Sequence, residues 1–234
     1  MKIHNLRHYG KSLLEMMEDV PPEIIKEISD LSFNLIEKHL NSDELEIFIT
    51  SLSMAKERLL KKNLTKVSEK GLNSNKFINQ QIEWAASFST AVKIIGKEKA
   101  LKIFREISEK TYPILFFYMF PKPEDLNEFA DPFKAFKDWF LAMMGANKKV
   151  GLFDYKIVVN NNDMFQMDCI WCAWHETYKH LGAKDACIPI CYADDAFYPD
   201  YFQKTGIKYN RTKTLGWGNA ICDFRFERSV KDFN

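Results

Sequence analysis

The spacing of apolar residues changes once along this chain, near residues 145–151. Before that point apolar residues recur at helical spacing, as Ile28, Leu31 and Leu35 do. After it, residues 153–159 read as an extended segment and are followed by residues typical of a turn. A helical first part followed by strands predicts an α+β protein with an antiparallel sheet.

The first part predicts a series of helices, several of which carry end signals. Asn73 and Ser74 open one of them, and Gly96 follows its last apolar residue. Asp131 followed by Pro132 is typical of a helix start. The helical apolar patterns cover residues 24–36, 45–55, 77–95, 101–107 and 133–143.

The second part predicts the order ββααββ. The strands are expected over residues 153–159, 164–168, 207–214 and 220–228, with a turn at 216–219 before the last one. The helices are expected over 169–181, ended by Gly182, and over 185–202, interrupted near Pro189 and Pro199. We interpret residues 1–148 as a helical region packed on an α+β unit of residues 149–234, in one compact domain.

Composition excludes several classes of protein. Hydrophobic residues make up 46% of the 234 positions, which is enough for a sizeable core. The formal net charge is +1, so nothing indicates a nucleic-acid partner. The longest apolar run, residues 114–120, is far shorter than the roughly 20 residues of a membrane helix. No secretory signal opens the chain, and its five cysteines are an odd number. We expect a cytoplasmic protein, a small-molecule substrate or ligand, and a homodimer as an open alternative.

All five cysteines lie between residues 169 and 222, among many acidic residues. They can be metal ligands, reactive thiols or small buried hydrophobic residues, and their spacing fits no closed zinc module. Asp194 follows Cys191 by three positions, so both share one face of a helix. His175 and His180 are interpreted as surface residues, and the aromatic segment 112–120 as core.

Three ordered segments resemble a known family. They are Cys187-Ile-Pro-Ile-Cys191-Tyr-Ala-Asp194, Arg211-Thr-Lys-Thr214-Leu215 and Gly218-Asn219-Ala-Ile-Cys222-Asp223-Phe224. Together they resemble the L-2-amino-thiazoline-4-carboxylic acid hydrolase family, over about residues 165–228. A more distant resemblance is to the vinyl-reductase-type ligand-binding domain, which binds small molecules. The first resemblance implies a hydrolase, and the second a non-catalytic sensor or accessory module that binds a small molecule or a metal.

The hydrolase resemblance implies the opening of a small cyclic amidine or thiazoline carboxylate to an N-carbamoyl amino acid. Its pattern brings Cys169, Cys191 and Cys222 together as ligands of a divalent metal such as zinc. The alternative is nucleophilic attack by a thiolate. The implied catalytic residues are Cys191, Asp194 and Cys222, and the implied substrate-binding residues are Arg211, Thr214 and Asp223. Acidic neighbours raise the pKa of a thiol, which favours either the metal or compensation by Arg211.

Overall fold

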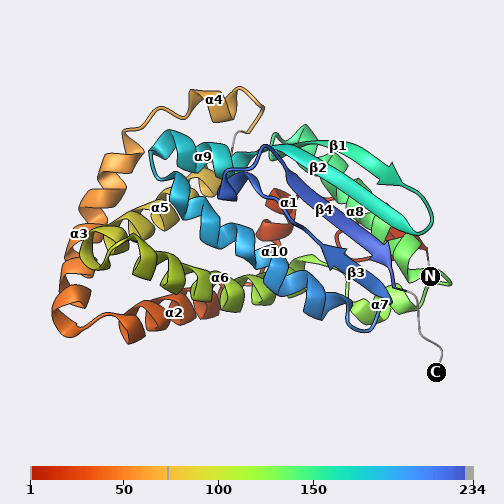
Figure 1. Ribbon diagram of the computed structural model, residues 1–234, viewed down its shortest axis with the longest axis horizontal. Coiled ribbons are helices and arrows are strands. Elements are labelled where there is room, and N and C mark those ends of the chain that lie inside the picture. Colours follow the sequence, from red (N-terminus) through yellow and green to blue (C-terminus); the bar gives the residue numbers. More distant parts are fainter. Residues whose placement is uncertain (1, 73, 230–234) are drawn as a thin grey trace.

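Long helices and one antiparallel sheet build the protein, which confirms the predicted α+β class with a helical first part (Figure 1). The computed structural model describes residues 2–72 and 74–229. No helix within these residues has the length and apolar character to cross a membrane. The elements before the sheet are η1 (Ile3–Asn5), α1 (Leu13–Glu18), α2 (Pro22–His39), α3 (Ser42–Leu60), α4 (Thr65–Ser68), α5 (Asn75–Ile95), α6 (Lys97–Met119), α7 (Pro123–Asn127) and α8 (Pro132–Lys149).

The helix ends follow local sequence signals. The Ser74 side chain accepts a hydrogen bond from the first turn of α5, whereas Asn73 lies outside the described residues. Asp131 caps α8 in the same way, with Pro132 at the first helical position. The short helix predicted at residues 101–107 is instead part of α6, which continues through Pro113. Packing against neighbouring helices stabilises this longer helix and outweighs the hydrogen bond that proline cannot donate.

The second part begins with a β-hairpin and ends with two further strands, and its helices lie between these two pairs of strands along the chain. Its elements are β1 (Phe153–Asn160), β2 (Met164–Cys172), α9 (Ala173–Leu181), η2 (Lys184–Ala186), α10 (Cys187–Phe202), β3 (Ile207–Asn210), η3 (Leu215–Trp217) and β4 (Cys222–Arg228). The strands lie in the order β1-β2-β4-β3, and every neighbouring pair is antiparallel. The last strand along the chain therefore pairs with both β2 and β3.

Several predicted details of this part are wrong. The predicted helix 169–181 starts only at Ala173, because β2 continues to Cys172. Strand pairing decides this, since Cys172 lies opposite Phe153 on β1 and Cys169 opposite Cys222 on β4. Strand β3 ends at Asn210 rather than at residue 214, and α10 runs unbroken from Cys187 to Phe202 despite its prolines.

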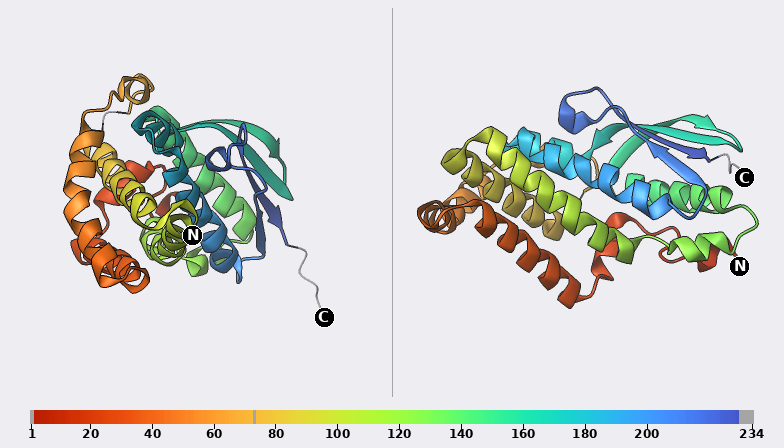
Figure 2. Two further views of the ribbon diagram at one scale, coloured as in Figure 1. Left: turned by 60° about the vertical axis from the view of Figure 1, so that its left-hand side comes forward. Right: turned by 60° about the horizontal axis from the view of Figure 1, so that its bottom comes forward.

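Helices α8 and α10 cover one face of the sheet, and the other face carries no helix of the described chain (Figure 2). Phe226 of β4 is fully buried at this contact, with ring centroids of Phe136 and Phe140 both 5.0 Å away. The second half of α6 joins the same core through Phe116, and Phe120 does so directly after the helix; both rings pack on Phe197. Helix α10 thus lies between the sheet and α6, and its first turn packs with α5 and α6 through Cys187.

Candidate functional site

The first two turns of α10 carry the residues that the sequence singled out. Cys187 and Cys191 are one helical turn apart, and their Sγ atoms lie 4.0 Å from each other. Cys187 is buried and Cys191 is half-buried. Asp194 and Asp195 follow on the next turn, so one helix presents two thiols and two carboxylates within nine residues (187–195). The predicted helical juxtaposition of Cys191 and Asp194 is therefore present.

Arg211 reaches this helix from the end of β3. Its Nη1 donates to Oδ2 of Asp194 at 2.7 Å, and its Nη2 to Oδ2 of Asp195 at 2.9 Å. Nη2 also donates to the main-chain carbonyl of Cys191. The side chain is only 1% exposed, and its Nε has no hydrogen-bond partner among the described residues. Both terminal nitrogens are thus engaged within the protein, so Arg211 is not a free counter-charge for a substrate carboxylate.

Asp194 and Asp195 share this single guanidinium, and the surroundings of Asp194 shift its pKa. Burial raises the pKa of Asp194 to about 6; Arg211 lowers it, and the neighbouring charge of Asp195 raises it. Tyr209 of β3 lies 3.4 Å from Asp195 through its hydroxyl group. Asp194 can therefore exchange a proton near neutral pH, as a general acid or base must.

The environment of Cys191 stabilises its thiolate. A hydrogen bond from Cys187 lowers the pKa of Cys191 most, and burial opposes this effect. The Thr214 hydroxyl and the positive charge of Arg211 lower the pKa further, while Asp194 raises it. The net direction is downward, and the positive charge of Arg211 offsets part of the effect of Asp194.

A tight turn covers the Cys191 sulfur. Thr214 caps this turn, η3, by accepting a hydrogen bond from the main-chain N–H of Trp217 at 3.1 Å. A β carbon placed on Gly216 would lie 2.6 Å from the Cys191 Sγ, so the sulfur or the backbone would have to shift. Glycine is therefore needed here because the backbone approaches the thiol directly.

The other candidate cysteines lie on the sheet, on the far side of the same turn. Cys169 and Cys222 are buried opposite each other on β2 and β4, and the main-chain N–H of Leu215 donates to the Cys222 Sγ at 3.2 Å. Hydrogen bonding to Cys222 and burial raise the pKa of Cys169. Leu215 and Gly216 thus contact one thiol pair each, and the sheet pair has the character of core residues.

Within residues 2–72 and 74–229, no group of three or more His, Cys, Asp or Glu side chains is placed to hold a metal ion. The predicted zinc ligands Cys169 and Cys222 form one pair, whereas Cys191 is paired with Cys187 on α10. A divalent metal therefore stays an untested prediction for this protein.

Asp223 fixes the backbone that leads into the turn. Its carboxylate accepts hydrogen bonds from the main-chain N–H groups of Thr212 and Lys213 at 2.9 and 2.6 Å, and from the Thr212 hydroxyl at 2.6 Å. Burial alone raises the pKa of Asp223, but these hydrogen bonds outweigh it and lower the pKa. Asp223 also borders a small polar hollow of about 120 Å³, lined by Gln166, Asn210, Arg211, Thr212, Asp223 and Arg225.

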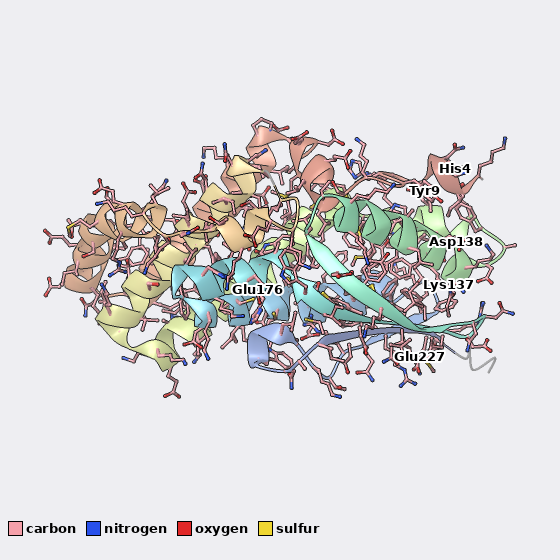
Figure 3. All side chains as sticks on the ribbon, turned by 90° about the horizontal axis from the view of Figure 1, so that it is seen from above. His4, Tyr9, Lys137, Asp138, Glu176 and Glu227 are labelled. Atoms are coloured by element: carbon pink, nitrogen blue, oxygen red, sulfur yellow. The ribbon has the colours of Figure 1, made fainter. Side chains whose placement is uncertain are left out.

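The histidines of α9 form a separate group around Glu176. His175 Nδ1 lies 3.2 Å from the Glu176 carboxylate, and the Nδ1 of His180 lies 2.8 Å from the Glu176 main-chain carbonyl. Figure 3 places Glu176 near the middle of the long axis, whereas Lys137, Asp138 and Glu227 lie toward the sheet end. Each histidine side chain is 20% exposed, so both are more enclosed than the expected surface residues.

Two residues at this site were not identified from the sequence. Asp195 shares Arg211, and Gly216 lets the turn approach the sulfur of Cys191. The adjacent Asp194 and Asp195 were a usable signal in the sequence, because two neighbouring acids that become partly buried need a cation. Gly216, in contrast, is part of an ordinary glycine-rich turn sequence, and only its contact with Cys191 in the structure shows why glycine is needed there.

The fold and the site define a helical α+β protein with a partly buried thiol next to a carboxylate–guanidinium network. The family model described as L-2-amino-thiazoline-4-carboxylic acid hydrolase matches residues 75–226, so the chain belongs to this family. The match covers α5, α6, α8, the hairpin, α10 and most of β4, and thus every residue of the site. Neither the curated proteins nor the solved structures contain a match to this chain.

Proposed function

We propose that this protein is a hydrolase that opens a small cyclic amidine carboxylate, of the thiazoline type named by its family, to an N-carbamoyl amino acid. In this reaction water adds to C2 of the ring, the bond from C2 to sulfur breaks, and the sulfur leaves as a thiol. The observation that carries the proposal is the half-buried Cys191, beside the proton-exchanging Asp194, within the matched family region.

In the proposed mechanism the Cys191 thiolate attacks C2. The ring sulfur departs with a proton from Asp194, whose pKa of about 6 leaves part of it protonated near neutral pH. Water then attacks the bound carbon, its proton returns to Asp194, and the Cys191 thiolate is released. Cys187 and Thr214 support the thiolate in the first step, because both lower the pKa of Cys191.

Arg211 acts in this proposal as a positioning residue. Its two ion pairs hold Asp194 and Asp195, and its third contact holds the main chain at Cys191. If Arg211 left these partners to bind a substrate carboxylate, two partly buried acids would be without a counter-charge. We therefore assign the substrate carboxylate to another group.

Incubation of the purified protein with 2-amino-thiazoline-4-carboxylate tests the proposal, with N-carbamoyl-cysteine detected by mass spectrometry and the new thiol by a thiol reagent. Replacing Cys191 with serine is expected to lower kcat by roughly 10³-fold or more. Replacement of Cys172, a thiol of β2, with serine is the matched control and should retain activity. Parallel assays with a chelator and with added zinc test the metal prediction. No turnover under any of these conditions would favour the non-catalytic ligand-binding module.

A further inference from the structure

A second guanidinium lies beside the turn that covers Cys191. The Cζ of Arg105, on α6, is 3.9 Å from the ring centroid of Tyr192, which follows Cys191 on α10. The Tyr192 ring lies 5.4 Å from that of Trp217, which follows Gly216. The immediate neighbours of the contact between Cys191 and Gly216 therefore carry two aromatic rings, and Arg105 stacks on one of them.

Arg105 has donors to spare, unlike Arg211. Its Nε donates to Oε1 of Glu109 at 2.6 Å, and no other hydrogen bond of its side chain is found in the described part of the chain. A guanidinium carries five N–H groups, so those on the two terminal nitrogens face solvent or a ligand. The Arg105 side chain is 49% exposed, compared with 1% for Arg211. A carboxylate that arrives from solvent thus meets Arg105 without displacing a buried partner.

We propose that Arg105 binds the carboxylate of the substrate, while Trp217, which is exposed beside Tyr192, contacts one face of its ring. This inference rests on the proposed function and specifies the substrate group that the site recognises. In a 4-carboxylated ring the reacting C2 and the carboxylate lie on opposite sides of the ring. The site offers the same arrangement, because the nucleophile Cys191 lies on α10 and the cation of Arg105 lies on the neighbouring helix α6. Guanidinium groups bind carboxylates through two parallel hydrogen bonds, which fixes orientation as well as affinity.

The other charges near Arg105 suit a substrate with both signs of charge. Glu109 is paired with it, and the negative charge of Asp195 lies close enough to act on it. A cyclic amidine accepts a proton readily and then carries a positive charge, which these acids favour. A zwitterionic ring with an amidinium and a carboxylate therefore fits better than a simple anion.

The test compares two substrates and three variants. The substrates are 2-amino-thiazoline-4-carboxylate and 2-amino-2-thiazoline, which lacks the carboxylate. Arg105→Gln removes the charge and Arg105→Lys keeps it. Lys134→Gln is the matched control, because it breaks a similar exposed ion pair with Asp138, on α8. Steady-state kcat and KM are measured for each combination, together with equilibrium binding by calorimetry.

For the carboxylated substrate, Arg105→Gln should raise KM by about 10- to 100-fold with kcat nearly unchanged, as expected for the loss of a charge-assisted hydrogen bond. The KM of Arg105→Lys should lie between that of Arg105→Gln and that of the unmodified protein. The substrate without a carboxylate should react equally well with the unmodified protein and with all three variants. An equal loss for both substrates, or no change for either, would overturn the assignment.

If the unmodified protein shows no turnover, the proposed hydrolysis is wrong, but the binding measurement still decides the role of Arg105. Weaker binding of the carboxylated compound to Arg105→Gln, with no change for Lys134→Gln, supports the anchor. Equal binding to both variants, or no binding to the unmodified protein, overturns it.

Discussion

Replacing Gly216 with alanine places a methyl group 2.6 Å from the Cys191 Sγ and 3.4 Å from both the carbonyl oxygen and the Sγ of Cys187. Extra atoms in a packed site cost about 1–3 kcal/mol. The φ angle of Gly216 lies outside the left-handed region, so alanine also restricts the unfolded chain, which stabilises the protein by about 0.4–1 kcal/mol. The free energy of unfolding should therefore fall by about 0.5–2 kcal/mol, which lowers Tm by about 1–8 °C for a chain of this size.

A double-mutant cycle attributes this loss to the sulfur. In a Cys191→Ala background the clash is absent, so Gly216→Ala should be neutral or slightly stabilising, with a coupling energy of about 1 kcal/mol or more. The control is Gly145→Ala, in α8, where a β carbon meets nothing within 4 Å. It should raise stability by about 0.5–1 kcal/mol, as in other helix interiors. Chemical denaturation of the four cycle proteins and this control gives the values. The steric argument is refuted if Gly216→Ala costs the same with and without the Cys191 sulfur.

Three further outcomes are expected. Because the folded-state pKa of Asp194 is raised to about 6, the stability that its protonated form contributes is complete below about pH 4 and is lost as pH rises through 6. The fall, at most about 3 kcal/mol, should be absent from Asp194→Asn in unfolding measurements across this range. Phe226→Ala should lower the unfolding free energy by about 3–5 kcal/mol, since the ring is fully buried, and a loss under 1 kcal/mol would contradict that packing. Arg211→Met should cost up to about 3–5 kcal/mol by leaving Asp194 and Asp195 unpaired, and adding Asp195→Asn should recover part of it, as monitored by Tm.

Much of the fold followed from local patterns. The change of apolar period near residues 145–151 predicted helices before a sheet, and β1 does begin at Phe153. Ser74 and Asp131 cap the helices that their positions indicated. These features depend on neighbours a few residues away in the chain, and the sequence displays such neighbours directly.

The predictions failed where distant partners compete with local preference. The Cys169–Cys172 segment has a spacing that suits a helix, but strands on both sides hold Cys169 in the sheet, opposite Tyr155 and Cys222. The helix predicted at residues 101–107 is longer in the structure, because the second half of α6 packs into the hydrophobic core. In both cases tertiary contacts add more stability than local propensity does.

The features of the candidate site also fall into those set by local sequence and those set by tertiary contacts. The sequence by itself determined that Cys191 and Asp194 share a helix face, because three residues make nearly one turn wherever a helix forms. Only the tertiary structure decided that Arg211 turns inward to two aspartates and that Gly216 rests on the Cys191 sulfur. Those contacts join residues 16 or more positions apart in the chain, and burial and charge compensation select them only after the sheet and α10 have packed together.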